Sequence, residues 1–183
     1  MIQELTDCGP NRTYPVYYLE DAMNNLGDCF DYAVNDYGAE GSEVAELFCL
    51  SGVAHEFERG NAWVVSGKSG VELFALIAER SGYQTGSMPD RTYRFEKTPE
   101  YWTGWILAYL QWRLGESFED LLHVVPFDVL CNLYYPWHEA SEERVARLVC
   151  DMAKKTSRQT KLALARKRLK KTQQDLAYES GVS

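Results

Sequence analysis

The sequence has no long apolar run. None of its stretches reaches the roughly 18 consecutive apolar residues that a membrane-spanning helix requires. The first four residues, Met-Ile-Gln-Glu, have neither the basic start nor the hydrophobic core of a secretory signal peptide. From these absences we expect neither a membrane-spanning helix nor a secretory signal peptide. They favour a soluble, cytoplasmic protein with no membrane partner.

Closely spaced cysteine pairs are also absent. The chain has five cysteines, an odd number, and no C-x-x-C pair. Zinc sites and disulfide frameworks normally show paired, regularly spaced cysteines. We therefore expect reduced thiols in a core, without a structural metal. The five positions are Cys8, Cys29, Cys49, Cys131 and Cys150.

Basic residues are almost missing from the first part of the chain. The 58 residues before Arg59 contain twelve Asp or Glu and one Lys or Arg. Residues 1–153 have a net charge of −15 and residues 154–183 one of +7. We divide the chain into an acidic helical domain, 1–155, and a basic tail, 156–183. One interpretation is a solvated acidic surface with a basic helix; the other is that the acidic body binds the basic channels of nucleic-acid-handling proteins.

The alternating pattern of β-strands is scarce, and helical spacing of apolar residues prevails. Ser69 with Glu72 forms a capping box, and Thr98-Pro99 is a typical helix start. The sequence therefore predicts an all-α helical bundle, with residues 83–98 as a loop and a short strand within it at 92–95. The predicted helices span 17–37, 42–58, 71–80, 99–114 and 141–155, with short helices starting after Ser117 and at Pro126.

The polar faces of the first two predicted helices are rich in carboxylates. We expect these carboxylates to point outward and to bind the basic groups of a partner. The candidate partner-binding residues are Asp21, Asp28, Asp31, Glu43, Glu46, Glu56 and Glu58.

Several strings resemble catalytic motifs without completing them. Gly67-Lys68-Ser69 ends like a phosphate-binding loop, but Ala62 stands where that motif has its first glycine. His55-Glu56 begins like a zinc motif, but Arg59 replaces the second histidine. The sequence leaves open a catalytic triad whose three residues are brought together only by the fold. We expect no catalytic residue, no metal and no cofactor, and hence a non-enzymatic protein.

Residues 160–183 resemble the start of the Cro/repressor-type helix-turn-helix family. The matching strings are Ala165-Arg166-Lys167, Thr172-Gln173, Leu176-Ala177 and Ser180-Gly181-Val182-Ser183. Lys170 and Lys171 replace the family's glycine and buried leucine, and glycine there suits the left-handed end of the first helix. The family's recognition helix lies beyond the matched residues. The expectation from this resemblance is a helix-turn-helix remnant that does not read DNA.

The body is similar to a helical domain found ahead of complete helix-turn-helix domains in gut bacterial regulators, some of them suspected antitoxins. The resemblance is carried by the stretches 18–28, YLEDAMNNLGD, and 99–109, PEYWTGWILAY. In size and charge the chain also resembles anti-CRISPR proteins directed at Cas9, some of which are related to repressors. What these resemblances imply is an inhibitor encoded by a phage or mobile element and acting in the bacterial cytoplasm. The implied partner is Cas9 or its complex with guide RNA; the alternative is a transcriptional regulator or antitoxin.

The basic tail allows two further interpretations. Its side chains could bind phosphates of RNA or DNA, with a steep salt dependence, or the tail could be a solvated helix or dock on the acidic body of a neighbouring copy. Self-association is also plausible because the chain has five tryptophans and the helix predicted over 99–114 is apolar on more than one face. The basic candidates are Lys154, Lys155, Arg158, Lys161, Arg166, Lys167, Arg168, Lys170 and Lys171.

Overall fold

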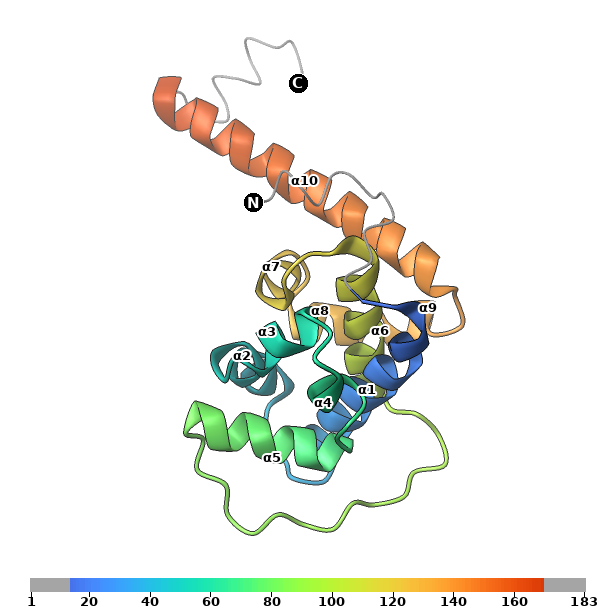
Figure 1. Cartoon of the computed structure of the whole chain (residues 1–183). Helices are drawn as coiled ribbons and strands as arrows, with labels where there is room; N and C mark the ends of the chain where they lie inside the picture. The colour runs from blue at the N-terminus through green and yellow to red at the C-terminus, as the bar shows by residue number, and fades with distance from the viewer. Residues whose placement is uncertain (1–13, 170–183) are drawn as a thin grey trace.

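A computed structural model describes residues 14–169 of the chain, with side chains for residues 14–156 (Figure 1). Its described residues form helices and no strand, which confirms the all-α bundle and makes the short strand predicted at 92–95 wrong. Within these residues, no helix combines the length and the apolarity needed to cross a membrane. After a short 3-10 helix, Val16–Tyr18, the helices are α1 Leu19–Asn35, α2 Gly41–Leu50, α3 Val53–Glu58, α4 Ala62–Val65, α5 Gly70–Ser81, α6 Pro99–Leu114, α7 Phe118–Val124, α8 Phe127–Asn132, α9 Tyr134–Trp137 and α10 Glu142–Leu169.

Helix ends follow the local signals of the sequence where those signals are strong. The Ser69 hydroxyl accepts a hydrogen bond from the Glu72 amide, and the Glu72 carboxylate accepts one from the Ser69 amide, which completes the capping box of α5. That helix ends at Gly82, whose φ of 73° is the left-handed conformation that glycine adopts without strain. Thr98 caps α6 directly before Pro99.

Helices α1 and α6 pack closely together at the centre of the bundle. A Cβ atom on Gly104 of α6 would lie only 2.4 Å from the backbone oxygen of Leu26 in α1. Helix α6 also contacts α7, α8, α9 and α10, which explains why its sequence is apolar on more than one face. Helix α5 covers another side of α1, and the 83–98 loop runs from the end of α5 to the start of α6 along the edge of the bundle (Figure 1).

Two predicted helix boundaries are wrong. The helix predicted over 42–58 is broken between α2 and α3 at Gly52, which has a φ of 74°. The last helix does not stop near residue 155; it continues to Leu169 and crosses the boundary proposed between the acidic domain and the basic tail. In Figure 1 this second half of α10 extends away from the other helices.

The cysteines follow the expectation of reduced thiols in part. Cys29, Cys49 and Cys131 are free, and Cys29 is fully buried. Cys150 in α10 is disulfide-bonded, so the expectation is wrong at that position.

Candidate partner-binding surface

The carboxylates toward the C-terminal end of α1 are neutralised by the 83–98 loop. Arg91 forms an ion pair with Asp28, and Arg94 binds Asp36 with both terminal nitrogens, at 2.7 and 3.0 Å. The same loop is fastened to the body by its backbone, because the Tyr32 hydroxyl donates to the carbonyl oxygen of Pro89 at 2.7 Å. The loop therefore supplies the counter-charges that the first 58 residues lack.

Asp31 lies at the centre of this arrangement and is only 4% exposed. One of its oxygens accepts hydrogen bonds from the Thr98 hydroxyl at 2.7 Å and the Asn35 amide at 3.1 Å. Its other oxygen lies 3.5 Å from Arg94. The predicted outward position of Asp31 is therefore wrong because Asp31 is buried, and Asp28 is half-buried and paired with Arg91.

The pKa of Asp36 reflects this environment. Its carboxylate accepts hydrogen bonds from the Arg94 side chain and from the backbone amide of Thr92. The hydrogen bond from Arg94 is the largest cause that lowers the pKa of Asp36 below its ordinary value, and burial opposes it. The partnership in turn raises the pKa of Arg94, so both groups stay charged near neutral pH.

Glu56 and Glu58 of α3 are also engaged within the chain. Glu56 accepts hydrogen bonds from Arg80 at 2.7 Å and from the Asn61 amide at 3.2 Å. Glu58 accepts one from the backbone amide of Phe118, the first residue of α7, at 2.7 Å. Both residues are half-buried. Their predicted outward position is wrong, because they connect α3 to α5 and α7.

Three of the seven acidic candidates, Asp21, Glu43 and Glu46, are exposed. Asp21 lies in the first turn of α1, and Glu43 and Glu46 lie one turn apart on α2. No hydrogen bond or ion pair joins these carboxylates to another side chain of the described part of the chain. These are the predicted candidates that the fold leaves open to a partner.

Glu46 belongs to a groove that we call the acidic groove, between α2, α7 and the start of α8. The groove has a volume of about 350 Å³, and its surface is mostly apolar. Glu46 and the exposed Glu119 lie on its two sides, and Leu50 at its edge is 76% exposed. No lysine or arginine is among its lining residues, which are Ser42, Ala45, Glu46, Cys49, Leu50, Glu119, Leu122, Pro126 and Phe127.

Cys49 in this groove is a poor nucleophile. Burial raises its pKa to about 11, with smaller contributions from the nearby carboxylates Glu119 and Glu58. The thiol is therefore protonated at neutral pH, whereas nucleophilic catalysis needs the thiolate. The groove is suited to binding an apolar group flanked by positive charge.

The three histidines of the chain, His55, His123 and His138, belong to three different elements: α3, α7 and the end of α9. The His55 Nδ1 lies 3.4 Å from Glu58, and the His138 ring stacks on Tyr134 with its Nδ1 at 3.0 Å from that residue's carbonyl oxygen. His123 is exposed at the end of α7. In the part of the chain that the structure describes, no three His, Cys, Asp or Glu side chains form a cluster able to hold a metal ion.

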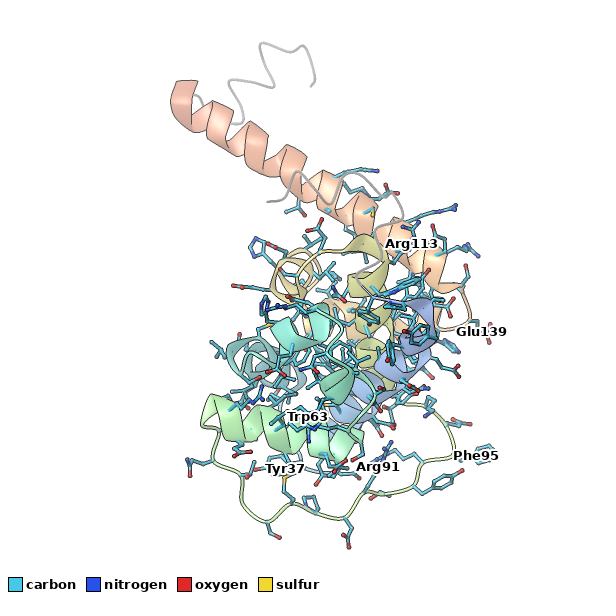
Figure 2. The ribbon with its side chains drawn as sticks, in the orientation of Figure 1. Tyr37, Trp63, Arg91, Phe95, Arg113 and Glu139 are labelled. Atoms are coloured by element: carbon cyan, nitrogen blue, oxygen red, sulfur yellow. The ribbon has the colours of Figure 1, made fainter. Side chains whose placement is uncertain are left out.

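The 83–98 loop displays two exposed aromatic side chains that the sequence pattern did not predict. Tyr93 is 87% exposed and Phe95 is 92% exposed. Figure 2 shows Phe95 at the outer edge of the loop, directed away from the helices. Residues on both sides are held, because the Thr92 amide donates to Asp36 and the Tyr134 hydroxyl donates to the carbonyl oxygen of Lys97. The alternation of these aromatic residues with Arg91, Arg94 and Lys97 was the sequence signal that could have indicated an exposed binding segment.

The basic candidates fall into three groups. Lys154 lies 3.6 Å from Asp151 of the same helix, and Lys155 is exposed. Lys170 and Lys171 lie outside the described residues. The backbone positions of the remaining five are helical, within α10. These five are Arg158, Lys161, Arg166, Lys167 and Arg168.

Comparison with known proteins adds no relative: no family model, curated protein or solved structure matches the chain.

Proposed function

We propose that this chain is a non-enzymatic inhibitor that captures a basic, nucleic-acid-handling protein. The observation that supports the proposal is the acidic groove, an apolar surface flanked by the exposed carboxylates Glu46 and Glu119 without a neutralising base. Glu43 adds a third exposed carboxylate on the same helix. Desolvated apolar contact with charges at the rim is the usual composition of a specific protein interface.

The proposed target is Cas9 or its complex with guide RNA. Cas9-type enzymes hold the guide and target strands in a strongly basic channel and read the adjacent DNA motif with arginines. An acidic surface bound there would occupy the groups that otherwise hold phosphates, and DNA would be excluded. The resemblance to repressor-related anti-CRISPR proteins supports this choice of target. In addition, Asp21 would extend the acidic contact and the basic residues of α10 would contact guide or target phosphates.

The test is cleavage of a target duplex by guide-loaded Cas9 with increasing amounts of the protein. We expect inhibition by the wild type, and at least a tenfold loss of potency for the double charge reversal Glu46→Lys with Glu119→Lys. The matched control is Glu139→Lys with Asp151→Lys, which changes the net charge equally at exposed positions outside the groove. Equal potency of both double variants would exclude the groove as the contact. Uninhibited cleavage at a large excess of wild type would exclude Cas9 as the target.

A second candidate function is a helix-turn-helix regulator or antitoxin. One observation favours it: α10 is helical through residues 160–169, where the resemblance to that family begins. A regulator would bind one duplex specifically, and a scrambled duplex would compete poorly. Competition assays with both duplexes therefore separate the two functions, because the inhibitor is expected to show little sequence preference.

A further inference from the structure

The first half of α10 is fixed to the body. Helix α10 contacts α6 and α7. The Arg113 side chain of α6 donates hydrogen bonds to both oxygens of Glu143 in α10, at 2.9 and 3.0 Å. Beyond these contacts the helix continues to Leu169 and extends away from the other helices (Figure 1).

The segment at the far end of α10 has the opposite composition to the acidic groove. Residues 157–169 contain five basic residues, three leucines and no Asp or Glu. The acidic groove offers two carboxylates, an apolar surface and about 350 Å³ of space, enough for more than one leucine side chain. A helix with apolar anchors flanked by bases is a common occupant of such a groove. The two surfaces are therefore complementary: their charges are opposite, and both carry apolar groups.

We propose that the acidic groove of one copy binds residues 157–169 of a second copy, so that two chains exchange their α10 helices in a homodimer. Intramolecular docking is disfavoured because α10 is continuous and directed away from its own body, and its last 13 residues span about 20 Å as a helix. A reciprocal exchange gives a closed dimer with two-fold symmetry, in which the contact between residues 157–169 and the acidic groove forms twice. The inference does not rest on the proposed function, because it needs no other protein.

Sedimentation and light scattering of the purified full chain test this dimer. We expect a dimer at about 50 mM NaCl that weakens at about 500 mM NaCl, since exposed charge pairs are screened by salt. Charge reversal in the groove, Glu46→Lys with Glu119→Lys, should give a monomer. Charge reversal in the tail, Arg166→Glu with Lys167→Glu and Arg168→Glu, should also give a monomer.

Mixing the two charge-reversed proteins is the decisive step. Each tail then meets a groove of opposite charge in the other protein, so a one-to-one heterodimer should form although neither protein dimerises alone. The control Glu139→Lys with Asp151→Lys should remain a dimer. Circular dichroism of every variant checks that it is folded. A monomeric wild type at low salt, a dimer that survives groove reversal, or the absence of a heterodimer would each overturn the proposal.

Crosslinking identifies the groove as the docking position. Leu50 lines the groove and is 76% exposed, so the substitutions Leu50→Cys and Leu162→Cys together allow a short bismaleimide to join two chains. We expect a covalent dimer of the double variant and none of either single variant. An equal yield of covalent dimer from the Leu162→Cys single variant would place the second copy elsewhere. These measurements contain no Cas9, so their outcome is independent of the cleavage assay.

Discussion

Two acidic regions of this protein have different roles. On α1 and at its C-cap, Asp28, Asp31 and Asp36 are paired with the arginines of a loop that is distant in sequence. At the acidic groove, Glu46 and Glu119 are exposed, and no lysine or arginine lines the groove beside them. The difference shows that a carboxylate's role depends on the segment that the fold places opposite it. Asp28, Asp31 and Asp36 stabilise the chain, whereas the carboxylates of the groove are free to bind a partner.

The physical basis of the contrast is solvation. A buried carboxylate must be compensated by hydrogen bonds and counter-charges, and losing them costs several times more than losing an exposed ion pair. Exposed carboxylates are solvated by water and contribute little to stability. Substitutions at the two regions should therefore have very different effects on the free energy of unfolding.

The largest effect is expected for Asp31→Ala. The change removes the acceptor of the Thr98 hydroxyl and one of the acceptors of the Asn35 amide and of Arg94, in a place where water does not easily replace it. We expect the free energy of unfolding to fall by about 2–3 kcal/mol. Urea denaturation measures it, with Asp21→Ala on the exposed part of the same helix as the control. Equal free energies of unfolding of the two variants would show that the buried carboxylate stabilises the chain no more than the exposed one.

A somewhat smaller effect is expected for Arg94→Ala. This change leaves the Asp36 carboxylate partly buried without its main partner and releases the loop from α1. We expect a loss of about 1–2 kcal/mol, because Arg94 itself is partly exposed to water. Limited proteolysis should also show faster cleavage within residues 83–98. Arg59→Ala is the control at an exposed position, and similar cleavage of both variants would show that Arg94 does not hold the loop.

Acid should destabilise the folded chain. The pKa of Asp36 is lower in the folded chain than its ordinary value of 3.8, so its contribution is present above that pH and is lost as the pH falls through the folded-state pKa. The pKa of Glu143 beside Arg113 is lowered too and adds to the loss in the same direction. We expect urea midpoints to decrease on acidification below about pH 4. The substitution Asp36→Asn should reduce the decrease of the urea midpoint per pH unit. An unchanged decrease would show that Asp36 does not contribute to the loss of stability in acid.

The smallest effect on stability is expected at the acidic groove. Glu46→Gln with Glu119→Gln removes two solvated charges of equal sign and breaks no hydrogen bond of the described side chains. At about 500 mM NaCl, where the proposed dimer is weakened, we expect the free energy of unfolding to change by no more than about 0.5 kcal/mol. Denaturation of this variant beside Asp31→Ala gives the sharpest form of the comparison. A loss above about 1 kcal/mol would mean that these carboxylates have a structural role.

Local sequence signals predicted much of the fold. Helix α5 could be read from Ser69, Glu72 and Gly82, and the start of α6 from Thr98 and Pro99, because caps and turns act between neighbouring residues. The break at Gly52 and the length of α10 were not predicted. A glycine within an amphipathic pattern is compatible with either a continuous or a broken helix, and a polar basic segment has no apolar stripe that marks where a helix ends.

The candidate site was predicted less well than the fold. Asp21, Glu43 and Glu46 were expected at the surface and lie there, whereas Asp28, Asp31, Glu56 and Glu58 are paired within the chain. Glu119, Leu50 and the exposed aromatic residues of the loop were not predicted at all. A groove formed by α2 and α7 cannot be read from either helix alone.

The sequence by itself determined the helical class, the charge division and several helix ends, because each depends on composition or on residues within one turn of each other. Only the tertiary structure decided which carboxylates are neutralised. Arg91 lies 63 residues from Asp28, and Arg94 lies 58 residues from Asp36. Ion pairs depend on distance in space, and the packing of the loop on α1 sets that distance.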